Sequence, residues 1–514
     1  MAAPGRSDAH VSPVLRGGYM RHPVVAIPIL SLCLAATLQA QCPDGTPPPC
    51  AQQPARLAPP PPNSVAVLYL DNLSRDTADA FLADGLTEEI IIRLGQVPRL
   101  DVKSRYEVQR YRGRPAEDPA VLGRALRTAY LVTGSVQRAG NRVRLRYEVI
   151  RAATRARVAG DVIDRASSDL LTVESDIARD VATAITGRLL PEERARLARP
   201  LTSDARAYEE YLRGLEEMNH SLDLPAIRSA LAHLDLAIAR DPSFAAAFAA
   251  RAEAWVNLAD GYVTGREGYG QARVAAARAL ALDSSQVRAY AMLGWAVLAL
   301  DLDAQEAERL GRRGVALDPH EDQSHGLLSQ ALLARGRIDE SIEEARRAWE
   351  MDSLVSANGD WYMHALIYGH RLDSAAALML RLRPISPPAE ADAVEGMLLA
   401  ARGDFRGALH LLDWRHYGGS VAGTYVRALL ARGDTVAARA TVDSMLAERT
   451  RGYYNPYTLA RAYAALGDMD LGLEWLRRAF DERTLWLIYV RLDDELAPLR
   501  ADPRYAVLDR QLRY

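Results

Sequence analysis

Apolar and polar positions change their spacing along the chain, and the change divides it into three parts. Residues 24–40 are almost continuously apolar, residues 64–192 mix strand-like and helix-like spacing, and residues 203–495 have helical spacing. Apolar residues recurring every three to four positions predict amphipathic helices, whereas alternation predicts strands with one wet face. The chain is therefore expected to be multi-domain, with a leader, a small α/β domain and an all-α region.

The middle part, residues 64–192, predicts the element order β-α-β-α-β-β-β-α, which is typical of a small α/β domain. Strands are expected at 64–70, 99–104, 129–136, 143–150 and 156–163, with helices at 77–97, 118–126 and 169–190. The tetrad RAGN at 138–141 fits a hairpin turn. The strand after it has four alternating apolar positions, Val143, Leu145, Tyr147 and Val149.

The region from 203 to 495 contains an internal repeat with two independent landmarks. Aspartates near the ends of expected helices are separated by 42, 35 and 34 residues; they are Asp241, Asp283, Asp318 and Asp352. Turn glycines are separated by 33, 34, 30 and 34 residues; they are Gly336, Gly369, Gly403, Gly433 and Gly467. A period of 34 is that of the tetratricopeptide repeat (TPR), a pair of antiparallel helices.

These spacings predict an all-α TPR superhelix (solenoid) of about seven to eight repeats over 203–495, closed by a capping helix at 496–514. Small residues are expected where the two helices of a repeat approach closely; they are Ser341, Ala408, Ala438 and Ala479. The Gly-rich run GYVTGREGYG at 261–270 is expected to be an insertion in one turn between helices.

The motifs of residues 64–190 also resemble a known family. SVAVLYLDNLS, FLADGLTEEIIIRL, YLVTGSVQRAGNRVRLRYEVI and DLLTVESDIARDVATAI together resemble the TolB amino-terminal-like (FlgO-like) domain. That domain often precedes TPR arrays, in proteins related to adenylate cyclases, membrane-bound CadC-like regulators and Ser/Thr kinases, and by itself implies no enzymatic activity. This chain departs from the pattern at Tyr69 and Leu70, where the family usually has a Pro-Phe pair.

The N-terminal residues 1–42 are expected to be a signal peptide or an N-terminal membrane anchor. Arg16 and Arg21 precede the apolar run, so both interpretations leave the bulk of the chain outside the cytoplasm: periplasmic or secreted, or anchored in the inner membrane. Residues 43–63 are expected to form a Pro-rich linker. Cys42 and Cys50 bracket its first part and are a candidate disulfide in an exported chain.

Composition and motifs exclude several kinds of chemistry. The net charge is −3, with acids interspersed among the arginines, so no nucleic-acid partner is expected. Phosphate-loop, dinucleotide, zinc-protease, nucleophile-elbow and kinase motifs are all missing from the sequence, so neither a cofactor nor enzymatic activity is expected. His320 and His325 lie beside Glu321 at a repeat boundary, but no third metal ligand accompanies the histidines. All three residues are interpreted as solvated helix-start residues. The acids at 493–495 are interpreted as a helix N-terminal cap.

The remaining candidate chemistry is recognition of a protein or peptide. By repeat phasing, Tyr454, Tyr457 and Arg461 are expected to face the groove of the array, and Gln330 and Arg427 are phased similarly. Interhelix packing is the competing interpretation for each tyrosine. The sequence thus predicts a non-catalytic interaction scaffold. The alternative is a sensor or regulatory module of a signalling system, in which the TolB-like domain binds a ligand.

Overall fold

The computed structural model describes residues 59–76, 79–114, 117–166, 173–259, 261–351, 353, 356–414 and 418–514. Residues 59–514 form one compact unit. The leader, most of the linker, Cys42 and Cys50 lie outside the described residues, so predictions about them stay predictions. Within the described part, no helix is both long enough and apolar enough to cross a membrane.

A mixed sheet forms the N-terminal part of this unit. Its strands are β1 (Ser64–Val67), β2 (Asp71–Asn72), β3 (Asp101–Val102), β4 (Tyr130–Ala139), β5 (Arg142–Arg151) and β6 (Ala156–Ala166). The order is β3-β1-β4-β5-β6, with β2 also pairing with β4; β1 lies parallel to β3 and β4, whereas β4, β5 and β6 are antiparallel. The β4–β5 turn is only Gly140–Asn141, shorter than the expected tetrad, and Gly140 has a φ of 60°.

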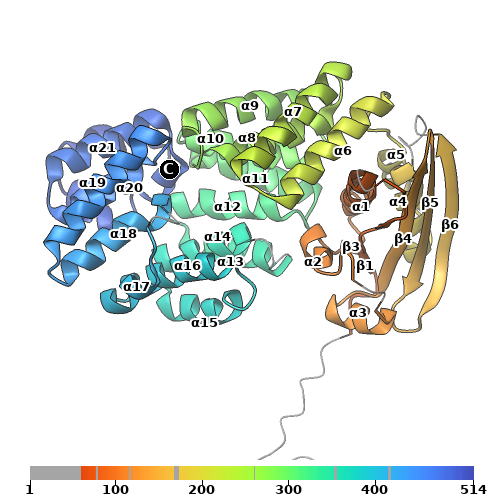
Figure 1. Cartoon of the computed structure of the whole chain (residues 1–514), viewed down its shortest axis with the longest axis horizontal. Helices are drawn as coiled ribbons and strands as arrows, with labels where there is room; N and C mark the ends of the chain where they lie inside the picture. The colour runs from red at the N-terminus through yellow and green to blue at the C-terminus, as the bar shows by residue number, and fades with distance from the viewer. Residues whose placement is uncertain are drawn as a thin grey trace, which may run out of the picture. The chain divides into compact units, whose positions relative to one another are not determined.

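Helices α1 (Ala80–Gly95) and α4 (Val173–Thr186) lie on one side of the sheet (Figure 1), whereas α2 (Arg105–Gln109) and α3 (Pro119–Ala125) cover only one end of the other face. The alternating apolar side chains of β5 are buried with α1 and α4 on one face, as the alternation predicted. Leu131 and Ala66 point to the other face, against α2 and α3. The short helix α5 (Pro191–Leu197) leads out of the sheet region.

The rest of the unit is a succession of antiparallel helix pairs, as expected for residues 203–495. They are α6 (Ala205–His220) with α7 (Leu224–Arg240), α8 (Ala245–Leu258) with α9 (Gly265–Leu282), α10 (Val287–Leu300) with α11 (Ala304–Leu317), α12 (Asp322–Ala334) with α13 (Ile338–Met351), α14 (Ser356–Tyr368) with α15 (Leu372–Leu382), α16 (Pro388–Ala401) with α17 (Phe405–Leu411), α18 (Gly418–Ala431) with α19 (Thr435–Arg451), and α20 (Pro456–Leu466) with α21 (Met469–Glu482).

The landmarks of the repeat have the expected structural roles. Asp241, Asp283 and Asp318 each follow the last residue of a second helix. Four of the turn glycines adopt the left-handed backbone that favours glycine, with φ between 72° and 82°; they are Gly336, Gly403, Gly433 and Gly467. The small residues expected between paired helices are fully buried.

Two local expectations about turns are wrong. At the turn after α14 the left-handed residue is His370, with a φ of 55°, and not Gly369. Gly369 is required there for space, because a Cβ would lie 2.5 Å from Cγ2 of Ile338. The Gly-rich run at 261–270 is also not all turn: Thr264 caps α9, and residues 265–270 form its first turns.

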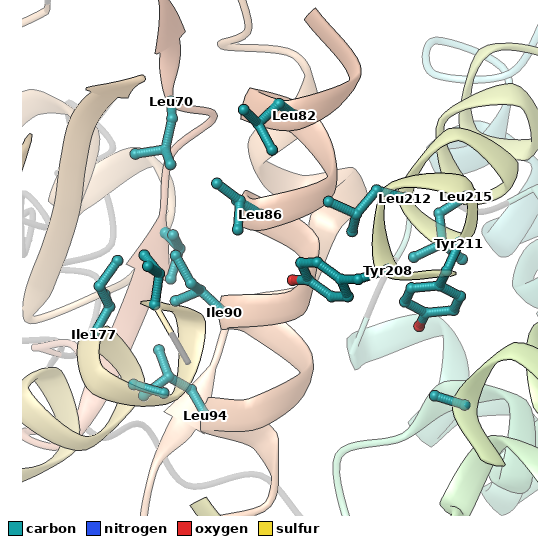
Figure 2. Close-up of a cluster of buried hydrophobic side chains, with 14 of the residues drawn as sticks. Leu70, Leu82, Leu86, Ile90, Leu94, Ile177, Tyr208, Tyr211, Leu212 and Leu215 are labelled. Atoms are coloured by element: carbon teal, nitrogen blue, oxygen red, sulfur yellow. The ribbon is translucent and has the colours of Figure 1, made fainter. Parts of the chain in front are cut away.

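The sheet region and the first helix pairs share one hydrophobic core. Tyr208, Tyr211 and Leu212 of α6 pack towards Leu82 and Leu86 of α1 (Figure 2). The approach is close, since a Cβ on Gly85 of α1 would lie 2.8 Å from the Leu212 side chain. The buried Tyr211 hydroxyl donates to Glu89 at 2.7 Å. The α/β elements are therefore joined to the helix pairs by packed side chains.

After α21 the chain turns back into the array. It forms the 3-10 helices η3 (Leu485–Tyr489) and η4 (Asp494–Leu496), then α22 (Ala497–Arg500) and α23 (Tyr505–Asp509). The expected C-terminal capping helix is thus two short helices. The backbone N–H of Arg513 donates to Leu302 at 2.7 Å, so the C-terminal end lies against the connection between α10 and α11 (Figure 1).

Candidate functional site

The first helix of each pair lies on a shared inner face, because α10, α12, α14, α16, α18 and α20 contact one another in succession. The predicted groove residues lie on or next to this face, but they do not line an open groove. Gln330, Tyr457 and Arg461 are buried, and Arg427 is partly exposed. The chain's own residues 484–496, here called the inner segment, lie against α10, α12 and α20 and contact four of the five predicted residues.

Arg461 of α20 holds the acidic end of the inner segment. Its Nε lies 3.2 Å from Asp493 and 3.0 Å from Glu495, and all three side chains are buried. Thr424 of α18 donates to Glu495 at 2.9 Å and accepts from Arg461 Nη2 at 2.9 Å. Arg427 adds a second positive charge, with Nη1 3.8 Å from Glu495. A buried guanidinium between two buried carboxylates is a close electrostatic contact in a region of low dielectric.

Aromatic rings hold the other end of the inner segment. Tyr489 stacks on Tyr368, with ring centroids 4.5 Å apart, and its hydroxyl donates to Gln330 at 2.7 Å. Trp486 lies edge-on to the ring of His364, with centroids 5.6 Å apart. The Tyr457 hydroxyl donates to Asp493 at 3.0 Å and thereby links the two ends.

The electrostatics of the inner face favour a neutral histidine and charged arginines. Burial and, secondarily, the positive charge of Arg461 lower the pKa of His364 to about 4. Burial raises the pKa of Glu495, opposed by Arg461. Burial lowers the pKa of Arg461, but the charges of Glu495 and Asp493 outweigh it, so the pKa of Arg461 is raised. The site therefore carries one matched charge cluster and an uncharged aromatic cluster.

Sequence phasing predicted that these residues face a groove, and it did not predict the inner segment that contacts Gln330, Arg427, Tyr457 and Arg461. The acids at 493–495 were interpreted only as a helix cap. Asp493 does cap η4, accepting from the Glu495 backbone at 3.0 Å, but it and Glu495 are also the partners of Arg461. The signal in the sequence is the apolar run LWLIYV at 485–490, which follows the last repeat and leads into the acids. Tyr454 is buried beside the N-terminus of α20, in the same hydrophobic cluster as Tyr457.

A second candidate site is a cavity of about 420 Å³. Its wall combines the C-terminal half of α1, residues 101–107, parts of α6 and α8, the start of α10, the turn between α11 and α12, and the end of α13. No local pattern in the sequence predicts this cavity, because its lining residues are spread from residue 88 to residue 351. Its rim includes His320, which is exposed as expected.

The neighbouring residues differ from their interpretation as solvated helix-start groups. His325 is buried, with Nδ1 2.6 Å from Glu344 and Nε2 3.2 Å from the carbonyl oxygen of Pro319. Glu321 caps α12, accepting from the Ser324 backbone at 2.6 Å, and lines the cavity. Among the described residues, no group of three or more His, Cys, Asp or Glu side chains is arranged to hold a metal ion.

Comparison with known proteins gives partial similarities. The chain matches no family model. It is 31% identical over 207 residues to a protein named putative adenylate cyclase 3 from Rhizobium meliloti (strain 1021); the match covers 39% of this chain and 35% of that protein. The chain thus spans about a third of the curated relative it matches, and the resemblance to the TolB-like domain stays a prediction.

Three solved structures resemble parts of the chain. They are PilW, a type IV pilus biogenesis factor (14% identity, TM-score 0.33, 40% of this chain and 90% of that chain), YrrB, a TPR protein with an unusual peptide-binding site (17%, 0.26, 40% and 94%), and a tetratricopeptide repeat protein from Parabacteroides merdae ATCC 43184 (14%, 0.31, 48% and 87%). The description of residues 205–482 as repeated helix pairs rests on the chain's own helices and turns.

Proposed function

We propose that the chain is a non-catalytic protein-interaction scaffold of the bacterial envelope, with a TolB-like domain followed by a TPR superhelix. The observation that carries this proposal is the inner segment itself. The inner face of the helix pairs holds a polypeptide through a buried arginine, stacked aromatic rings and a glutamine amide. Aromatic and arginine anchors of this kind dominate the affinity of protein interfaces.

The chemistry of the inner segment indicates what a partner of this face offers. An aromatic side chain at 489 is followed four and six residues later by carboxylates at 493 and 495. A partner peptide with this pattern satisfies Tyr368, Gln330 and Arg461 in the same way. Such a peptide competes with the inner segment, so its apparent affinity depends on how tightly the chain's own residues bind the inner face.

A labelled peptide of residues 484–496 tests this proposal. The full chain is compared with a variant whose own segment is weakened by Tyr489→Ala and Glu495→Gln, after circular dichroism has shown that the variant is folded. We expect the peptide to bind the variant more tightly than the parent. The matched control is the same peptide carrying Asp493→Asn and Glu495→Gln, which we expect to bind at least ~10-fold more weakly. Equal affinity of both peptides contradicts the proposal.

The non-catalytic part of the proposal rests on the sequence, in which no catalytic motif was found. Envelope location rests on the apolar stretch at 24–40 and the arginines before it. Catalytic turnover of a substrate, if a single point substitution abolished it, would contradict the non-catalytic part of the proposal. Fractionation of the native cell tests the second, with the protein expected outside the cytoplasm.

The relative named putative adenylate cyclase 3 favours a second candidate function, that of a regulatory module in signalling. In this alternative the sheet region binds a ligand and the helix pairs relay the result. The shared core of α1 and α6 would provide the contact between the two parts. Neighbouring genes discriminate: kinases or transcription regulators favour signalling, whereas secretion or envelope-assembly genes favour the scaffold.

A further inference from the structure

The wall of the cavity beside α1 has more acidic than basic side chains. Nine of its lining residues are Asp or Glu and four are Lys or Arg. The rest of the wall includes apolar side chains, among them Ile91, Ile92, Val102, Val287 and Met351, together with neutral polar side chains. A space of about 420 Å³ lies in the range of small-molecule sites, which combine an apolar wall with a few oriented polar groups.

Each positive side chain in the wall already has a carboxylate partner. Lys103 lies 3.4 Å from Asp101, Arg105 lies 3.5 Å from Glu88, and Arg288 lies 3.3 Å from Glu253. Arg347 pairs with Glu343 and Glu344 of its own helix, at 3.1 Å and 3.0 Å. The cavity therefore has no unpaired cation, among the described residues, to attract an anionic ligand.

Four carboxylates in the same wall form no ion pair within the described part of the chain: Glu89, Asp318, Glu321 and Asp322. Glu89 is 1% exposed; its Oε1 accepts from Tyr211, and its Oε2 has no hydrogen-bond partner. A buried polar atom without a partner is unfavourable and calls for an explanation. A ligand that donates hydrogen bonds supplies one.

The other three carboxylates lie together at the turn between α11 and α12. Burial raises the pKa of Glu321, and the negative charges of Asp322 and Asp318 raise it further. Burial likewise raises the pKa of Asp318 and of Asp322. The turn lies close to α1, since a Cβ on Gly95 would be 3.1 Å from Oδ2 of Asp318. Like charges gathered in one place favour a bound positive charge.

We propose that this cavity binds an organic cation, an alkylammonium or guanidinium group on an apolar stem. Glu321 and Asp322 bind the charged group, Glu89 accepts a hydrogen bond deeper in the wall, and Ile91, Ile92 and Val102 contact the stem. A metal ion fits less well, because the carboxylates of the described residues do not form a metal-binding group. The same chemistry is present in a free polyamine and in a lysine or arginine side chain of a partner protein.

Isothermal titration calorimetry on the full chain tests the proposal with two probes. Spermidine represents the free polyamine, and a Lys-Arg peptide with blocked termini represents a partner side chain. We expect at least one probe to bind with an affinity that falls as salt is raised, because exposed charges are screened. Binding of spermidine alone assigns the cavity to a small molecule, and preference for the peptide assigns it to a partner protein.

Variants locate the binding. Glu321→Gln and Glu89→Gln remove the charges while keeping an acceptor oxygen, and each is expected to weaken binding about 10-fold, the effect of one charge-assisted hydrogen bond. Glu474→Gln, at an exposed position of α21, is the matched control and is expected to leave the affinity unchanged. If Glu321→Gln does not fold, Glu89→Gln carries the test. Absence of binding by both probes, unchanged affinity in the folded variants, or tighter binding of citrate than of spermidine overturns the proposal.

Discussion

The inner face around Arg461 and the cavity around Glu89 both bury charged groups, but they differ in whether the chain itself supplies the partners. Arg461 has two carboxylates, a threonine hydroxyl and a nearby tyrosine, all from this chain. Glu89 accepts from one tyrosine hydroxyl and has no ion-pair partner among the described residues. Where the chain satisfies its own charges, the contact stabilises the fold; where it does not, a ligand has something to gain.

The largest expected effect comes from breaking the satisfied cluster. Arg461→Gln leaves Asp493 and Glu495 buried without their cation, and we expect it to lower the free energy of unfolding by about 3–5 kcal/mol. Urea denaturation followed by circular dichroism measures this. Arg504→Gln is the control: it removes an exposed arginine paired with Asp470 and Asp502, and we expect a loss below about 1 kcal/mol. Equal losses in the two variants would contradict the comparison.

The second-largest expected effect is a dependence of stability on pH. The pKa of His364 is about 4 in the folded chain and about 6.5 in the unfolded chain, so between these values the unfolded chain binds more protons. Stability is therefore lost as the pH falls from about 6.5 towards 4, by at most about 3 kcal/mol from this residue. Urea midpoints at pH 7 and pH 5 measure the loss in the parent. His364→Phe keeps an aromatic ring without a titrating group, and the loss is expected to shrink; an unchanged pH profile would contradict the assignment.

A smaller loss is expected from a single hydrogen bond of the inner segment. Tyr489→Phe keeps the ring stacked on Tyr368 but removes the hydroxyl that donates to Gln330, leaving that buried amide oxygen without its donor. We expect about 1–2 kcal/mol of destabilisation, measured by chemical denaturation. Tyr262→Phe, at a largely exposed tyrosine, is the matched control and is expected to change little. A similar cost at both positions would show that the inner segment is not held as described.

The smallest change in stability is expected from a substitution in the cavity. Its sign distinguishes the cavity from the inner face around Arg461. Glu89→Gln keeps an acceptor for Tyr211 and removes a buried charge that has no ion-pair partner among the described residues. We expect stability to stay within about 1 kcal/mol of the parent or to rise, because removing an uncompensated buried charge relieves its desolvation. Thermal unfolding of the parent and the variant measures it. A loss as large as that of Arg461→Gln would show that Glu89 is a structural ion.

Much of the fold was predictable because local spacing determines it. The period of 34 predicted the helix pairs. Helical phasing predicted that Gln330, Tyr457 and Arg461 face a groove, whereas in the structure they are buried in contact with the inner segment. The inner segment was not predictable in the same way. Its contact with Gln330 joins residues 159 positions apart, and no local pattern encodes such a distance. The cavity was still harder to predict, because its wall combines a few residues from each of several helices, including α1, α8 and α12, that are distant in the sequence.

Amide hydrogen exchange of the full chain is the most direct test of the central claim, that the inner face is occupied by the chain's own segment. Leu487, Tyr489, Val490 and Leu496 are buried, and Val490 donates its backbone N–H to Leu487. We expect peptides covering 484–496 to exchange as slowly as those covering α20, and Arg461→Gln to accelerate exchange of the former. Exchange of 484–496 at the rate of an unfolded chain in the parent would show that the segment leaves the inner face open, contrary to the account.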